Sequence, residues 1–173
     1  ISRGYGGSTA GPHPVLANDE AARCGDEPVL LARRSKGPVW IGKDRVAVAR
    51  ALLAANPGCN IIISDDGLQH YHLARDVEIA VVDGSRGVGN GLLLPAGPLR
   101  EPPSRLSTVD AVVVRGPVTQ AVASAAAAFV MTLKPAGLRN LHDASRRVDA
   151  SHFKGLRVHA VAGIGNPQQF FDT

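Results

Sequence analysis

Continuous apolar, β-branched runs constrain the fold of this chain more than any other feature. Such runs are typical of strands covered on both faces, as in a mostly parallel sheet. They lie at residues 60–64, 77–84, 109–116, 129–133 and 156–163, with a weaker candidate at 38–42. Helices are predicted between them at residues 27–35, 44–56 and 118–128. This alternation predicts an α/β fold with an open, doubly wound sheet, whose ligands bind outside the carboxyl ends of the strands.

Composition excludes several classes of protein. The 173 residues suffice for one domain, the net charge of +4 is scattered, and aromatic residues make up only 4%. Nucleic acid is therefore not indicated as a partner. No apolar stretch is long enough to span a bilayer, so we expect the chain itself to be soluble. Cys24 and Cys59 are isolated, which indicates neither a zinc site nor a disulfide and fits a reducing cytosolic setting.

The sharpest candidate site is the segment IIISDDGLQH at residues 61–70, in which an apolar run leads directly into Asp65 and Asp66. Kinase folds use a carboxylate at the end of a buried strand to hold Mg²⁺. Adjacent residues on an extended chain point in different directions, so one acid can reach a metal while the other orients its neighbours. A simple turn opened by Asp-Asp-Gly explains the pattern equally well.

A second acidic pair, Asp26 and Glu27, stands at the predicted start of a helix. Acids at this position commonly stabilise the positive end of the helix dipole, and on its own this is the simpler interpretation. Together with a second pair at a strand end, they could instead complete a metal site and accept a hydroxyl proton.

One apparent phosphate-binding loop is rejected. Residues 37–43 match the GxxxxGK spacing, but Asp44 follows where a Ser or Thr is needed, and the interior Pro-Val-Trp-Ile resembles a strand. The Gly- and Pro-rich residues 83–105 predict a long surface loop of the kind that is often functional.

Five motifs, in this order and across nearly the whole chain, resemble the lipid A 4'-kinase (tetraacyldisaccharide 4'-kinase) family. They are SRGYGG, GDEPVLLARR, DDGLQHYHLARDVEI, VVDGSRGVGNGLLLPAGPLREP and VAGIGNPQQFF. The resemblance implies a P-loop NTPase-type fold that transfers the γ-phosphate of ATP, with Mg²⁺, to the 4'-hydroxyl of tetraacyldisaccharide 1-phosphate. The product would be lipid IVA.

The resemblance also implies roles for the two acidic pairs. Asp26 is expected to act as the catalytic carboxylate for the sugar hydroxyl, and Glu27 as a Mg²⁺-associated acid. Asp65 corresponds to the Walker-B-type metal ligand, while Asp66 and His70 complete the catalytic group.

Five further residues are expected by the same resemblance at the substrate or in the cleft. Arg3 and Tyr5 would lie near the substrate, and Gln69 would shape the site. Arg100 and Glu101 would lie at the active-site cleft. An arginine next to a glutamate in a loop is, however, more commonly an exposed ion pair.

The family resemblance places residues 1–155 in the core of the kinase domain and residues 156–173 at the start of a C-terminal lobe. It further implies that the Walker A loop lies upstream of Ile1, so that this chain alone is inactive, and that the enzyme works peripherally at the cytoplasmic face of the bacterial inner membrane. Two alternatives remain. One is a non-catalytic α/β binding module, and the weaker one is a metal-dependent hydrolase, for which no His cluster supplies ligands.

Overall fold

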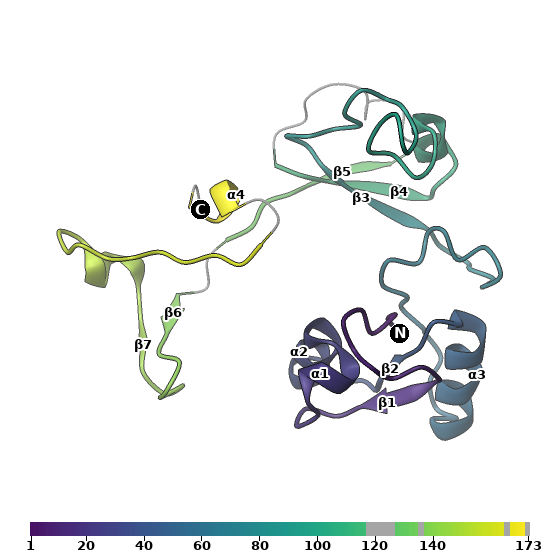
Figure 1. The fold of residues 1–173 in the computed structure, drawn as a ribbon, viewed down its shortest axis with the longest axis horizontal. Helices are drawn as coiled ribbons and strands as arrows, with labels where there is room; N and C mark the ends of the chain where they lie inside the picture. Colours follow the sequence, from purple (N-terminus) through teal and green to yellow (C-terminus); the bar gives the residue numbers. More distant parts are fainter. Residues whose placement is uncertain (117–126, 135–136, 165–166, 172–173) are drawn as a thin grey trace. The chain divides into compact units, whose positions relative to one another are not determined.

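The computed structural model describes residues 1–116, 127–134, 137–164 and 167–171. The chain divides into two compact units, Ile1–Glu78 and Ile79–Thr173 (Figure 1). Among the described residues, no helix combines the length and apolarity needed to cross a bilayer.

The first unit packs helices around a small two-stranded sheet. Its elements are β1 (His13–Val15), α1 (Ala21–Cys24), α2 (Asp26–Arg34), β2 (Val39–Ile41) and α3 (Arg45–Ala55). Strands β1 and β2 are antiparallel, with Pro14 opposite Trp40. A core of Val15, Cys24, Val29 and Ile41 joins both strands to α1 and α2. The weak strand predicted at residues 38–42 is thereby confirmed, whereas β1 and α1 were not anticipated.

Helices α2 and α3 confirm the predictions for residues 27–35 and 44–56. The Asp44 carboxylate accepts a hydrogen bond from the Ala47 amide at 3.0 Å and so caps α3. Val48 and Leu52, one turn apart, are buried along one face of that helix. Because β2 occupies the interior of the GxxxxGK match, the rejection of a phosphate-binding loop there is supported by the structure.

The predicted strand at residues 60–64 is wrong as a strand, although its backbone finds a partner. The Ile1 amino group donates to the Ile63 carbonyl at 2.6 Å, and the Asp65 amide donates to the Ile1 carbonyl at 2.9 Å. Ile61 and Ile63 are 73% and 80% exposed. A strand needs a continuous ladder, and here the pairing involves Ile1 alone.

The second unit contains the predicted parallel sheet. Strands β3 (Ile79–Asp83), β4 (Ala111–Arg115) and β5 (Ala128–Met131) pair in parallel, in the order β3-β4-β5 (Figure 1). Val112 and Val114 of the central strand are almost completely buried, as continuous apolar runs predict. The mostly parallel α/β class is thus confirmed. Most of the helix predicted at residues 118–128 lies outside the described residues, and Ala128 belongs to β5.

The remaining elements of this unit are short. They are η1 (Pro103–Ser107), β6 (Leu138–Arg139), β7 (Arg147–Val148), η2 (Ala150–Phe153) and α4 (Pro167–Phe171). The strand predicted at residues 156–163 is wrong: these residues form no strand, and Val158 and Val161 are 56% and 87% exposed. An apolar run becomes a strand only where a neighbouring strand pairs with it. The expected division at residue 155 remains a prediction.

Candidate active site

Three extended segments of the first unit end at one edge. Ser2 forms a parallel bridge with Ile41 of β2, while Ile1 bonds to Ile63 and Asp65 with the spacing of parallel strands. The residues that follow these segments are therefore brought to the same edge, which is where α/β folds bind ligands. They are Lys43 and Asp44 after β2, Arg3 after Ser2, and the Asp65-Asp66 pair.

Close glycine contacts bring the start of α2 to this edge as well. A side chain at Gly7 would lie 2.6 Å from the Arg23 carbonyl oxygen, and one at Gly25 would lie 2.6 Å from the Tyr5 carbonyl oxygen. The two backbones can approach only because both residues lack a Cβ. The Tyr5 side chain itself is 84% exposed, so the structure leaves its ring without close packing.

The two acidic pairs converge, which the sequence alone left undecided. The Glu27 carboxyl is partly shielded from water, which raises its pKa above the ordinary value, and the negative charges of three aspartates raise it further. In decreasing order these are Asp65, Asp26 and Asp66. The Asp26 carboxylate also accepts a hydrogen bond from the Glu27 amide at 2.9 Å, so it stabilises the start of α2.

Replacing Glu27 by glutamine is expected to raise the melting temperature slightly at pH 7. A raised folded pKa means that the folded chain binds more protons than the unfolded chain between the two pKa values. Ionised Glu27 therefore destabilises the fold above its folded pKa, and this penalty disappears as the pH falls through that value. The gain should be small because the side chain is exposed.

Thermal unfolding at pH 7 and below the ordinary glutamate pKa of about 4.3 checks this prediction. Glu20→Gln is the matched control, because Glu20 is also exposed and its side chain caps no helix amide. A gain that is the same at both pH values, or is shared by the control, would contradict the repulsion.

Arg45 is a buried cation behind the acids that the sequence did not reveal. It is 2% exposed, and its guanidinium donates to the carbonyl oxygens of Gly42 at 2.6 Å and Asp65 at 3.5 Å. Burial and then the charge of Arg3 lower its pKa, whereas the Asp65 and Asp66 charges oppose this. Arg3 therefore lies in the same group of charges. An arginine within the predicted helix 44–56 was the available signal, but its burial depends on tertiary packing.

His70 and Gln69 line a cavity beside these charges. Its volume is about 270 Å³, and Lys43, Arg45 and His72 contribute to its wall. Burial, followed by the charges of Arg45 and Arg3, lowers the pKa of His70, so its imidazole is neutral at pH 7. A neutral imidazole can accept or donate a hydrogen bond here.

A second hollow, of about 470 Å³, is lined by the acidic pair at the start of α2. It is lined by Asp26 and Glu27 together with residues of α1 and α2, including Leu30 and Arg33. Asp26 and Glu27 are thus accessible from a concave surface that is large enough for a small ligand group.

The Asp-Asp-Gly turn holds its acids in an unusual backbone conformation. Asp66 has a φ of 48°, in the left-handed region that aspartate tolerates better than most residues. A Cβ at Gly67 would lie 2.8 Å from the Ser64 hydroxyl oxygen, which explains the glycine. The interpretation of this segment as a turn is therefore confirmed, and its interpretation as a metal site stays a prediction.

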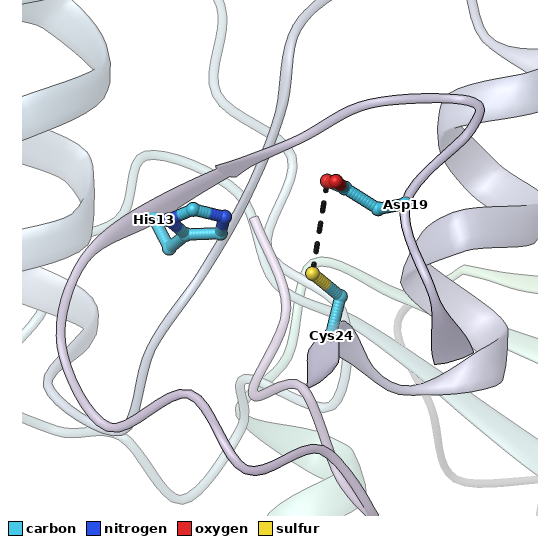
Figure 2. Close-up of side chains that lie close together, drawn as sticks. All are labelled: His13, Asp19 and Cys24. Atoms are coloured by element: carbon cyan, nitrogen blue, oxygen red, sulfur yellow. Dashed lines mark hydrogen bonds between the residues drawn. The ribbon is translucent and has the colours of Figure 1, made fainter. Parts of the chain in front are cut away.

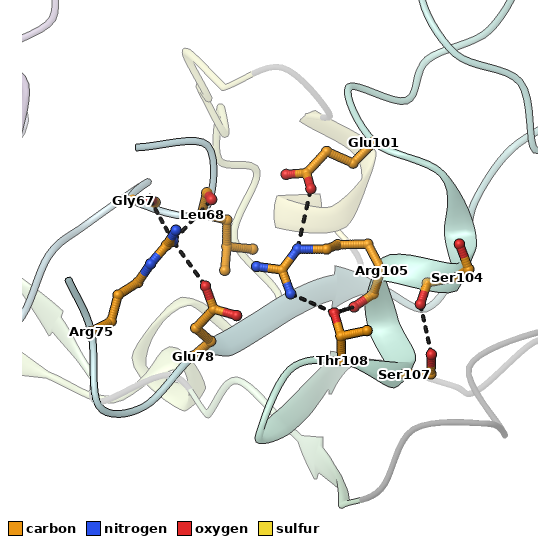
Figure 3. A network of polar contacts seen from close by, with 9 residues as sticks. All are labelled: Gly67, Leu68, Arg75, Glu78, Glu101, Ser104, Arg105, Ser107 and Thr108. Atoms are coloured by element: carbon orange, nitrogen blue, oxygen red, sulfur yellow. Dashed lines mark hydrogen bonds and ion pairs between the residues drawn. The ribbon is translucent and has the colours of Figure 1, made fainter. Parts of the chain in front are cut away.

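Arg100 and Glu101 belong to the second unit. Arg105 of η1 donates to the Glu101 carboxylate at 3.2 Å and to the Thr108 hydroxyl at 2.7 Å (Figure 3). The Glu101 side chain is thereby held, whereas Arg100 is exposed. These contacts fit a fixed loop conformation around Glu101.

His13, Asp19 and Cys24 form a cluster in the first unit whose potential ligand atoms lie within 4.8 Å of one another (Figure 2). The Cys24 thiol donates to Asp19 at 3.7 Å, and Arg23 lies 3.1 Å from a ring nitrogen of His13. Burial raises the pKa of Cys24, which keeps its thiol protonated, whereas metals bind the thiolate. Because the Arg23 guanidinium already occupies a ring nitrogen of His13, the cluster is best explained as packing around α1.

The family profile described as Tetraacyldisaccharide-1-P 4'-kinase matches residues 1–173. The chain belongs to this family. It is 56% identical to the tetraacyldisaccharide 4'-kinase of Chromobacterium violaceum over 100% of its own length and 51% of that protein. It is 55% identical to the enzyme of the same name from Azoarcus sp., covering 99% of this chain and 50% of the relative. The chain thus spans about half the length of these curated relatives.

A solved structure agrees with the family assignment. The crystal structure of LpxK from Aquifex aeolicus in complex with ATP superposes with a TM-score of 0.71 at 27% sequence identity. The match covers 99% of this chain and 55% of the solved one. The α/β fold of the P-loop kinase type is therefore shared with a family member.

Proposed function

We propose that the protein carrying this chain is a tetraacyldisaccharide 4'-kinase, which transfers the γ-phosphate of ATP to the 4'-hydroxyl of tetraacyldisaccharide 1-phosphate and forms lipid IVA. The observation that carries the proposal is the convergence of the two acidic pairs at the edge of the first unit. Phosphoryl transfer depends on positioned charges rather than on covalent chemistry, and this edge provides them. The names of the relatives and the ATP bound in the solved structure give further support.

In this proposal Asp26 accepts the proton of the attacking sugar hydroxyl. Its neighbour Glu27 and Asp65 would hold the metal, and Asp66 and His70 would complete the catalytic group. The lowered pKa of His70 supports a neutral imidazole that hydrogen-bonds rather than adds a charge. Such preorganised groups supply much of the rate in phosphoryl transfer.

The remaining predicted residues are assigned to substrate binding. Arg3 and Tyr5 would contact the anionic disaccharide, and Gln69 would shape the cavity beside His70. Arg100 and Glu101 are proposed for the cleft, with Glu101 oriented by Arg105.

The acids fit Mg²⁺ by the chemistry of their donors. Hard carboxylate oxygens are its preferred protein ligands, and the repulsion that raises the pKa of Glu27 would be relieved by a cation. Glu27 and Asp65 are the residues we assign to it. When bound there, Mg²⁺ would neutralise negative charge on the phosphates of ATP.

The proposed substrate is a lipid, so we further propose that the protein works peripherally at the cytoplasmic face of the inner membrane, where ATP is present. Basic residues at the edge, such as Arg3 and Lys43, suit the phosphate of the lipid and an anionic membrane surface. Nucleic acid has no part in this proposal.

Transfer of labelled phosphate from ATP to tetraacyldisaccharide 1-phosphate by the full-length protein tests the function. We expect a Mg²⁺-dependent 4'-phosphorylated product from the full-length protein and none from residues 1–173 alone. A folded full-length protein that binds the lipid without transferring phosphate would instead favour the binding module. Release of inorganic phosphate from a lipid substrate would favour a hydrolase.

A further inference from the structure

Arg75 lies outside the predicted site residues, yet it makes a concentrated set of contacts with the segment that carries them. Its Nη1 atom donates to the carbonyl oxygens of Gly67 at 3.0 Å and Leu68 at 2.9 Å (Figure 3). These two carbonyls lie between Asp66 and His70. A single guanidinium therefore ties down the middle of the acidic turn.

The guanidinium is itself held in place by two further contacts. Its Nη1 atom lies 3.0 Å from the Glu78 carboxylate, and both side chains are only 18% exposed. Its Cζ atom lies 5.4 Å from the centre of the Tyr71 ring. The planar, always charged guanidinium suits this arrangement better than the ammonium of lysine, since it can present Nη1 to oxygen atoms while its face lies near the ring.

The segment that Arg75 holds needs such support. Asp66 has a φ of 48°, a conformation that is less favourable than the right-handed one even for aspartate, so surrounding contacts help to hold it. The Gly67 carbonyl that accepts from Arg75 also accepts from the His70 amide at 2.9 Å. Holding this carbonyl thus fixes the turn that leads from Asp66 to His70.

We propose that Arg75 is a positioning residue, which through the carbonyls of Gly67 and Leu68 keeps Asp66 and His70 in their places for phosphate transfer. The inference rests on the proposed function of this site and assigns no contact between Arg75 and substrate. Residues that orient groups in direct contact with a metal or substrate typically cost about 10- to 100-fold in activity when lost.

The test uses the full-length protein and two readouts. Arg75→Ala should lower kcat about 10- to 100-fold, with a smaller change in KM for either substrate. It should also speed amide hydrogen exchange at His70, whose amide closes the turn. Arg75→Lys keeps the charge and a donor, and should recover part of both.

Three further variants separate the contacts. Arg75→Gln keeps a donor but removes the charge that helps to lower the pKa of His70, so the acid side of the pH-rate profile should move to higher pH. Glu78→Gln removes the ion pair but leaves the carbonyl contacts, and should change kcat about twofold or less. Arg34→Ala, at an exposed arginine ending α2, is the control for general effects.

The proposal is overturned if Arg75→Ala keeps wild-type kcat, or if kcat falls while exchange at His70 is unchanged. It is also overturned if Glu78→Gln matches Arg75→Ala, because the ion pair would then be the important contact. If Arg75→Ala fails to fold, Arg75→Lys decides by the same two readouts. A wild-type protein without transferase activity would refute the proposed function and this inference with it, whereas an active wild type with a silent Arg75→Ala refutes the inference alone.

Discussion

Asp65→Asn in the full-length protein is expected to lower kcat for lipid phosphorylation about 100- to 1,000-fold. The change keeps the size of the side chain and removes the charge that faces Glu27 and Arg45. The residual rate should also require more Mg²⁺, since the oxygen ligand that we propose at this position would lose its negative charge. Steady-state kinetics across a Mg²⁺ titration measure both effects.

The matched control for this change is Asp76→Asn, at an exposed aspartate of the same unit. It should leave kcat and the Mg²⁺ dependence unchanged. Near wild-type activity in Asp65→Asn would remove this residue from the metal site and leave the Asp-Asp-Gly segment as a turn only. A loss of kcat with an unaltered Mg²⁺ requirement would point to a role in positioning instead.

Gly25→Ala is expected to destabilise the first unit by about 2 kcal/mol or more. Gly25 has a φ of 88° and a ψ of 148°, a region that residues with a Cβ rarely adopt. The added Cβ would also lie 2.6 Å from the Tyr5 carbonyl oxygen, a backbone atom that cannot move without shifting the 2–7 segment. Urea unfolding followed by the fluorescence of Trp40, the single tryptophan of the chain, reports the change.

Gly58→Ala serves as its control, because no atom lies within 4 Å of the Cβ it would add. We expect its free energy of unfolding to stay within about 1 kcal/mol of wild type. Alanine lowers the entropy of the unfolded chain, which offsets small costs in the folded state. Equal destabilisation by both changes would mean that the contact between Gly25 and Tyr5 is unimportant. A loss of stability in Gly25→Ala alone would show that the first unit depends on the close contact between Gly25 and Tyr5, which brings α2 to the site.

Local pattern was enough to predict several elements correctly. The apolar face of residues 44–56, with Asp44 before it and Pro57-Gly58 after it, specifies α3 without reference to the rest of the chain. Continuous valine-rich runs likewise predict β3 and β4, because β-branched residues favour strands, although Val81 of β3 is 66% exposed. The family itself was recognisable from the order of its motifs.

The two incorrect strands share one physical cause. Residues 60–64 and 156–163 have strand-like composition, yet they form no regular ladder. The residue types show that a segment is able to form a strand. Forming one also requires a neighbouring strand to pair with, and the position of that strand is set by the rest of the fold.

The sequence by itself determined helices α2 and α3, the parallel strands and the types of residue available for chemistry, since each follows from patterns within a few residues. Only the tertiary structure decided that Asp26 and Glu27 meet Asp65 and Asp66, because that meeting depends on Ile1 and Ser2 pairing with distant backbone and on Gly25 lying against Tyr5. It likewise decided that Arg45 is buried and that Arg75 donates a hydrogen bond to the acidic turn at Gly67. Contacts between residues far apart in sequence leave no local pattern, and for this reason they appear only once the chain is folded.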